Sequence, residues 1–156
     1  QTIAFVSGEK LTMVILDTVS GVSLTRVSDM GCTNVPAGYG CLRVANMSYA
    51  GSSYDVRTFN NQTAFAGIGY KEVTSYKQTS SGTYTFFVTG SQYSVSALGE
   101  LPVLVLSSIV GVSCPTCTVS NPLLTFNVSV RAGRAYTCYI IGNPWSGLFR
   151  AYVLED

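Results

Sequence analysis

The chain has no histidine, and only 11% of its 156 residues are charged. Histidine is the commonest general base and the usual zinc ligand, and it is a member of the Ser-His and Cys-His nucleophile pairs. Its absence excludes all of these. Nine Lys and Arg residues against eight Asp and Glu residues leave a net charge of +1. This balance provides no basic face for nucleic acid and no polybasic patch for a membrane surface. We therefore expect a protein that is not an enzyme and that uses no cofactor or metal.

Long apolar runs are also missing. The longest, residues 101–112, is about half of the roughly 20 residues that a membrane-spanning helix requires, and serines interrupt it. No membrane insertion is expected. Because the sequence begins at Gln1 rather than at a methionine, we expect the mature product of signal-peptide removal, although a trimmed chain would begin in the same way.

Few carboxylates are available for acid–base chemistry. A glycosidase needs two of them roughly 5 to 10 Å apart in a cleft. Asp55 and Glu72 are the pair that could face each other across neighbouring strands. Carboxylates on strands and loops are usually solvated, and this is how we interpret both. Calcium sites need clustered oxygen ligands, but the sequence has no Asp-x-Asp-like loop.

Five cysteines indicate an oxidising environment. Cys32 and Cys41 bracket a loop rich in Gly and Pro, and a disulfide between them is the first pairing that we expect. Cys114 and Cys117 have the spacing of a redox motif or of half a zinc site, but the residues that follow do not indicate a helix. We expect a structural disulfide within this turn or from it to Cys138. If both local pairs form, Cys138 is left as a buried thiol or is joined to another molecule.

Three sequons for N-linked glycosylation begin at Asn46, Asn61 and Asn127. Asn61 follows Asn60 at an expected hairpin tip, and Asn127 falls on the outward face of an alternating strand. Together with the cysteines, the sequons predict a secreted or cell-surface glycoprotein.

The stretch Gly82–Gly90 carries the clearest secondary-structure pattern. Tyr84, Phe86 and Val88 fall on one side of an extended chain and threonines fall on the other. This alternation predicts a half-buried strand between two turns. About ten to twelve short strands are expected along the chain, including one polar strand over residues 70–79, and no helix longer than a turn. The fold class is all-β, an Ig-like antiparallel β-sandwich with an extra N-terminal apolar strand segment.

Two regions are expected. Residues 1–40 form an N-terminal segment of roughly three short strands and the disulfide loop, and this segment is a candidate donor strand for another molecule. Residues 41–156 form the β-sandwich domain. We find no clear internal repeat and no linker to a second domain.

Two segments are apolar on both faces of a strand, residues 11–16 and residues 101–112. Such a strand is usually buried on both faces, but a two-layer sandwich has only one dry face per sheet. Either the two segments cover each other within one molecule, or one of them completes the sheet of a neighbouring molecule. The residues expected to take part in self-association are Ile3, Phe5, Leu11, Met13, Ile15, Val103 and Val105.

Aromatic residues are common, with ten tyrosines and with Trp145 in a turn. An aromatic ring at a loop tip can stack on a sugar, and it can equally pack against a strand or an interface. Packing is the interpretation that we favour for Trp145.

From Leu42 onward, the order of short motifs resembles the family catalogued as domain of unknown function 4397, a secreted and cell-surface β-sandwich. The motifs are Leu42–Asn46, Tyr54–Arg57, Gly69–Tyr76, Gly82–Thr85, Val130–Thr137 and Val153–Asp156. The resemblance implies a surface or adhesive role and supplies no catalytic residues. About 40 residues at the front and a long insertion over residues 93–120 depart from the family pattern.

These observations predict an extracellular structural or adhesive protein that associates with itself, as the repeating subunit of a filament built by N-terminal strand addition. Its main partner would be a second copy, with cell-surface glycans as a further partner. The alternative is a secreted carbohydrate-binding module that uses loop aromatics such as Trp145.

Overall fold

The structure is a computed structural model, and it describes residues 4–18, 21–29, 31–49, 53–58, 62–91, 122–144 and 148–156. Ten strands lie in these ranges. They are β1 (Lys10–Thr18), β2 (Gly21–Asp29), β3 (Tyr39–Ser48), β4 (Tyr54–Thr58), β5 (Thr63–Ile68), β6 (Lys77–Ser80), β7 (Gly82–Gly90), β8 (Leu124–Val130), β9 (Ala135–Gly142) and β10 (Arg150–Glu155). No helix of the described ranges is long and apolar enough to cross a membrane.

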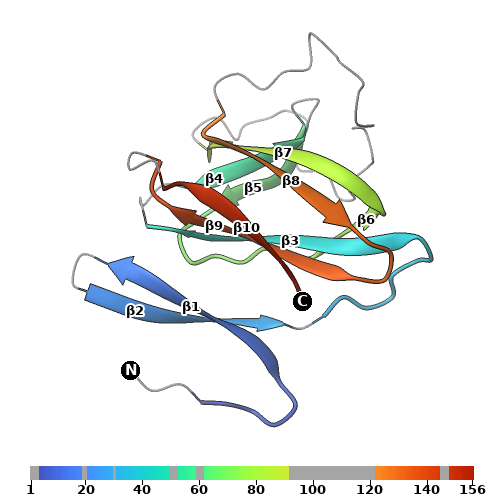
Figure 1. Cartoon of the computed structure of the whole chain (residues 1–156), viewed down its shortest axis with the longest axis horizontal. Coiled ribbons are helices and arrows are strands. Elements are labelled where there is room, and N and C mark those ends of the chain that lie inside the picture. The colour runs from blue at the N-terminus through green and yellow to red at the C-terminus, as the bar shows by residue number, and fades with distance from the viewer. Residues whose placement is uncertain are drawn as a thin grey trace.

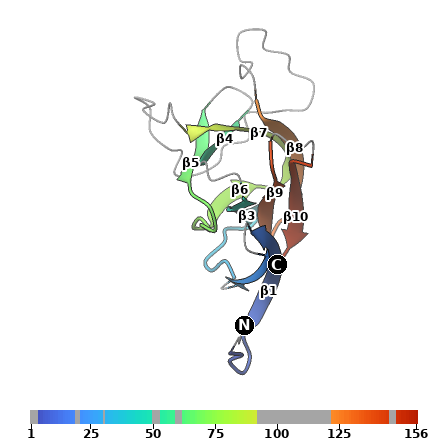
Figure 2. The same cartoon turned by 90° about the vertical axis from the view of Figure 1, so that its left-hand side faces the viewer.

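The strands form three layers, as Figures 1 and 2 show. The distal sheet has the order β5-β4-β7-β8, the central sheet has the order β10-β9-β3-β6, and β1 and β2 form a separate hairpin. The central sheet lies between the distal sheet and the hairpin. The predicted all-β sandwich is therefore confirmed, with a third layer added to it.

The sandwich is not purely antiparallel, which corrects our expectation. Strands β3 and β9 run parallel, with eight residues in register from Cys41↔Ala135 to Ser48↔Gly142. The other ladders are antiparallel. A parallel pair needs a long crossover, and here the chain passes through the distal sheet between β3 and β9. Short-range alternation carries no signal for such a pairing.

Strand β7 has the two faces that its sequence predicts. Tyr84, Phe86 and Val88 are buried between the two sheets of the sandwich, whereas Thr83 is exposed and Phe87 is half-buried. The Phe86 ring lies 5.6 Å from the ring of Phe126 on the neighbouring β8. This aromatic row contributes to the larger of the two hydrophobic clusters.

Strand β3 is buried on both faces, although its sequence resembles a half-exposed strand. Leu42 and Val44 belong to the cluster between the central and distal sheets. Ala45 and Met47 belong to a second cluster that faces the hairpin. Both faces of the strand are covered because β3 lies in the middle layer (Figure 2).

The N-terminal segment forms one hairpin rather than about three short strands. Strands β1 and β2 pair over their full length, from Lys10↔Asp29 to Thr18↔Gly21. Leu16 and Val27 on the inner face of the hairpin pack against the central sheet. A single hairpin forms because it buries both of these apolar side chains against the central sheet.

The polar strand expected over residues 70–79 is mostly absent. Only Lys77–Ser80, strand β6, pairs with β3. Farther upstream, the chain contributes an isolated bridge between Ala45 and Val73. The chain turns at Lys71, whose φ is 67° and whose N–H donates to the Asn46 carbonyl. This turn prevents a continuous strand from forming over residues 70–79.

The disulfide between Cys32 and Cys41 is present, as predicted, and it joins the segment after β2 to the start of β3. Cys138 has a free thiol that is completely buried in the core of the sandwich. Burial raises the pKa of this thiol above its usual value. An intermolecular disulfide through Cys138 would therefore require the sandwich to open.

The opposite faces of β7 provide a matched stability test. Phe86→Ala removes a ring that is 1% exposed and is expected to lower the free energy of unfolding by about 3–5 kcal/mol. Phe87→Ala, one residue later on the opposite face, is expected to cost about 1 kcal/mol or less. Urea denaturation of both variants measures the difference, and equal losses would contradict this assignment of faces.

Candidate docking surface on the amino-terminal hairpin

A buried arginine attaches the hairpin to the central sheet at one end. Arg43, on β3, is 6% exposed. Its Nε donates to Thr137 Oγ1 at 2.9 Å, and its Nη2 donates to the carbonyl of Ser28 on β2 at 3.0 Å. The guanidinium also lies over the ring of Tyr76, 4.5 Å from the ring centre. One side chain thus joins β2, β3 and β9.

Two carboxylates complete this polar network. The Tyr76 hydroxyl donates to Asp156 and, at 3.4 Å, to Asp29 at the end of β2. Thr137 Oγ1 donates to Asp156 at 2.7 Å. Burial, followed by the hydrogen bond to Asp156, raises the pKa of Tyr76. The hydroxyl therefore stays protonated and keeps its role as a donor.

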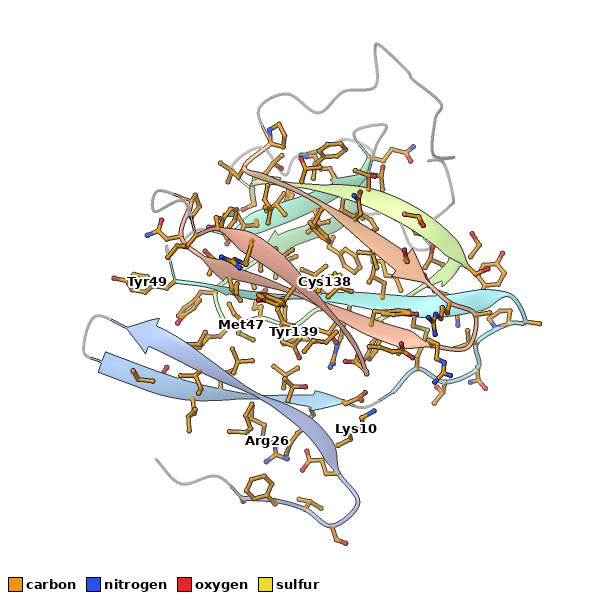
Figure 3. The ribbon with its side chains drawn as sticks, in the orientation of Figure 1. Lys10, Arg26, Met47, Tyr49, Cys138 and Tyr139 are labelled. Atoms are coloured by element: carbon orange, nitrogen blue, oxygen red, sulfur yellow. A yellow bond between two sulfur atoms is a disulfide. The ribbon has the colours of Figure 1, made fainter. Side chains whose placement is uncertain are left out.

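The remaining contact between the hairpin and the central sheet is apolar. Leu16 and Val27 pack against Ala45, Met47 and Tyr139. Figure 3 shows Met47 and Tyr139 pointing from the central sheet toward the hairpin. The hairpin is thus held to its own sandwich by a polar network at one end and by an apolar cluster along its inner face.

The opposite face of the hairpin is largely apolar, with Arg26 and Ser28 of β2 as polar members. We define the outer hairpin face as Leu11, Met13, Ile15, Val22 and Leu24, which alternate with the inward-facing side chains. Ile15 is 71% exposed and Val22 is 68% exposed, whereas Leu11, Met13 and Leu24 are half-buried. The two-sided apolar character predicted for residues 11–16 is therefore covered on one face only.

An apolar groove lies between β1 and the central sheet. Its volume is about 310 Å³. We call it the β1–β10 groove, and its lining residues are Thr12, Met13, Val14, Ile15, Tyr139, Ile141, Tyr152 and Leu154. None of these side chains is charged. Two of them, Tyr152 and Leu154 on β10, are 51% and 42% exposed.

The chain before β1 forms an exposed segment, which we call the amino-terminal arm (residues 4–8). Phe5 is 74% exposed and Val6 is 64% exposed. Arg26 Nη1 donates to the Ala4 carbonyl at 2.9 Å, and Figure 3 shows Arg26 on the side of the hairpin that faces the arm. Arg26 also pairs with Glu9, and this hydrogen bond is the main cause that lowers the pKa of Glu9.

The two residues of the candidate acid pair, Asp55 and Glu72, both accept hydrogen bonds from backbone N–H groups. Asp55 is completely buried, which corrects our interpretation of it as a solvated charge. It accepts a hydrogen bond from Gly67 N–H at 2.8 Å and pairs with Arg57 at 3.4 Å. These bonds hold an irregularity in the β4–β5 ladder, where Gly67 has φ of 58°. Glu72 accepts from Gly69 N–H in a nearby turn.

Metal ligands do not gather in the part of the chain that the structure describes. No group of three or more His, Cys, Asp or Glu side chains there could hold a metal ion.

Other predicted site residues fall outside the described ranges. They are Ile3, Asn61, Val103, Val105, Cys114, Cys117 and Trp145. The predictions for a second disulfide, for a self-associating insertion and for sugar stacking stay predictions.

The half of the groove that β9 and β10 supply is not among the predicted site residues. Tyr139, Ile141, Tyr152 and Leu154 are separated from β1 by more than 100 residues of chain. One local signal was available, because Tyr152 and Leu154 are apolar at the positions of β10 that alternate with the inward-facing Ala151 and Val153.

Two of the three predicted sequons lie within the described residues, and their environments differ. Asn46 is completely buried, and its Nδ2 donates to the Ile68 carbonyl at 2.9 Å. This corrects the prediction of a glycan on Asn46, because a buried amide in the core has no room for a sugar. Asn127 is exposed on β8, where its Oδ1 accepts from Thr85 Oγ1.

We therefore expect selective glycosylation when a secretory eukaryotic host produces the protein. Peptide mapping before and after endoglycosidase treatment should find sugar on Asn127 and none on Asn46. The variant Ser129→Ala, which destroys the sequon of Asn127, serves as the control. Occupancy of Asn46 in folded protein would contradict its burial.

The Arg43 network predicts how the hairpin is attached. Arg43→Leu removes charge-assisted hydrogen bonds worth about 1.5–3 kcal/mol. Hydrogen exchange of residues 10–29 should therefore quicken about 10- to 100-fold, while the distal sheet is unaffected. Exposed Arg131, changed to Leu, is the matched control. Uniform acceleration over all strands would show that Arg43 does not act on the hairpin specifically.

Comparison with known proteins finds one family. The family model described as Domain of unknown function (DUF4397) matches residues 40–156. The match contains nearly all of β3 and every strand from β4 to β10, whereas the hairpin lies outside it. No curated protein matches the chain. Because the match extends over most of the sequence and agrees with the motifs from Leu42 onward, the chain belongs to the DUF4397 family of domains of unknown function.

Proposed function

We propose that this protein is an extracellular, non-enzymatic structural or adhesive protein that associates with copies of itself into an extended polymer. The observation that carries the proposal is the outer hairpin face, whose exposed Ile15 and Val22 lie on a strand pair that is already apolar on its other face. A solvated hairpin would normally place polar side chains at these positions.

The energetic argument supports association. Complete burial of one Val or Ile side chain contributes about 1.5–3 kcal/mol. Ile15 and Val22 retain most of this driving force in a single chain, because each is more than two-thirds exposed. The exposed Phe5 and Val6 belong to the arm, which Figure 1 shows on the hairpin side of the molecule, and they add to it. Apolar surfaces of this kind mark protein interaction sites.

The apolar surfaces are of two kinds, which permits a polymer. The arm and the β1–β10 groove belong to different parts of the chain. A contact between two different surfaces is head-to-tail, and it continues from copy to copy unless its rotation closes a ring. A reciprocal exchange, in which two copies fill each other's groove, would give a closed twofold dimer instead.

An extracellular location and the absence of an activity remain parts of the proposal. The Cys32–Cys41 disulfide and the exposed sequon at Asn127 support an oxidising, secretory environment. The chain has no histidine, and its buried carboxylate Asp55 is engaged in structural bonds.

The carbohydrate-binding alternative depends on Trp145, which lies outside the described residues. It stays a prediction that a glycan array, repeated with Trp145→Ala, can test.

Two lysines on the outer hairpin face should interrupt assembly. The wild type is expected to form multimers that grow with concentration, observed by light scattering after size exclusion and by negative-stain electron microscopy. The double variant Ile15→Lys, Val22→Lys should weaken association at least tenfold, because each substitution forfeits more than about 1.4 kcal/mol of apolar burial.

Thr83→Lys is the matched control, since Thr83 is exposed on the distal sheet, away from the hairpin. It should assemble like the wild type. A wild-type protein that stays a monodisperse monomer at high concentration would refute the proposed function.

A further inference from the structure

One edge of β1 has no strand beside it in the described part of the chain. All nine residues of β1 pair with β2 on one side, and the resulting sheet has two strands. The amide and carbonyl groups on the other edge therefore have no ladder partner among the described strands. An unpaired strand edge of this length is a template for an added strand.

This edge opens on the β1–β10 groove. Residues Thr12 to Ile15 of β1 form one wall of the groove, and Tyr139, Ile141, Tyr152 and Leu154 form the floor. A strand added here would place alternate side chains on this floor and the others beside Met13 and Ile15 on the outer hairpin face. The occupant must therefore be extended, uncharged and apolar on both faces.

The amino-terminal arm meets these requirements. The first eight residues read Gln-Thr-Ile-Ala-Phe-Val-Ser-Gly and contain no charged side chain. In an extended chain, Phe5 would share one face with Ile3, and Val6 would share the other face with Ala4. In the single chain, Phe5 and Val6 are mostly exposed, and the described arm residues belong to no strand. The arm is therefore uncharged and apolar, as the occupant of the groove must be.

The hairpin itself is a poor candidate for exchange between copies. The Cys32–Cys41 disulfide ties the chain three residues after β2 to the start of β3. The Arg43 bond to the Ser28 carbonyl secures the same end. The arm, in contrast, precedes β1. Its five residues would span about 17 Å if extended, at roughly 3.4 Å per residue, and residues 1–8 would span about 27 Å.

The arm is directed away from the groove of its own chain. The Glu9 N–H donates to the Val6 carbonyl in a turn around Gly8, whose φ is 80°. Arg26, an outward residue of β2, holds the Ala4 carbonyl. The arm thus leaves across the outer side of the hairpin, while the groove lies at the far edge of β1.

We propose that the amino-terminal arm of one copy binds in the β1–β10 groove of a second copy, as a third strand beside β1. This inference rests on the proposed self-association and names its donor segment and its acceptor site. Each copy carries one arm and one groove, so the same contact repeats along the polymer.

Cysteine cross-linking between differently tagged chains tests the inference. One chain carries Phe5→Cys and the other carries Leu154→Cys, and both positions are exposed in the single chain. Oxidation of the mixture should give a disulfide-linked heterodimer. A mixture of Phe5→Cys with Thr83→Cys is the matched control and should give only the background that wild-type chains give.

An arm variant supplies the second measurement. Phe5→Asp with Val6→Asp should weaken assembly at least tenfold and leave the thermal unfolding midpoint unchanged, because both side chains are exposed. Leu123→Asp, at an exposed apolar residue just before β8, should assemble normally. A synthetic peptide of residues 1–8 should compete with assembly of the wild type.

The outcomes separate the two proposals. Wild-type polymers that persist in the arm variant, without the Phe5–Leu154 cross-link, would overturn the donor arm and leave self-association standing. A chain with both cysteines that cross-links only within itself would overturn it too, because the arm would then fill its own groove. A wild-type monomer that does not bind the peptide would overturn both.

Discussion

Strand β3 must be covered on two sides, and the rest of the molecule follows from this constraint. Leu42 and Val44 need the distal sheet, whereas Ala45 and Met47 need a layer on the opposite side. Arg43 lies among the second set and is buried with its hydrogen bonds satisfied across three strands. A buried guanidinium is tolerated only with such partners. The hairpin supplies both the apolar cover and one of these acceptors.

The hairpin that covers β3 has exposed apolar residues on its own outer face. The hairpin buries Leu16 and Val27 and presents Ile15 and Val22 to solvent. It also covers only part of the central sheet, which leaves Tyr152 and Leu154 of β10 exposed. The family match begins at residue 40 and excludes the hairpin. The outer hairpin face and the arm thus lie outside the matched domain, whereas the exposed apolar residues of β10 lie within it.

Features that depend on neighbouring residues could be predicted from the sequence. The alternation in β7, the loop between Cys32 and Cys41 and the apolar character of residues 11–16 can each be read from a few neighbouring residues, and each is present in the structure. Features that depend on distant partners were missed. Asn46 fits a surface sequon and Asp55 fits a solvated charge until β5 brings the carbonyl of Ile68 and the N–H of Gly67 against them.

The parallel pairing of β3 with β9 belongs to the same category, because its partners are separated by more than 90 residues. The groove has one wall from β1 and a floor from β9 and β10, so its existence depends on how the hairpin docks. The apolar pattern of residues 11–16 predicts the wall through Met13 and Ile15. The floor has only the local signal of Tyr152 and Leu154, and no local pattern brings β10 beside β1.

The disulfide near the base of the hairpin has a mechanical consequence. In a polymer joined through the arm, a pulling force enters each subunit at the free edge of β1 and leaves through the arm that precedes β1. Any part of that force that crosses the hairpin ladder to β2 reaches β3 through the Cys32–Cys41 bond, so the loop between the two cysteines cannot lengthen under tension. The sandwich that begins with β3 therefore lies outside the main path of the load.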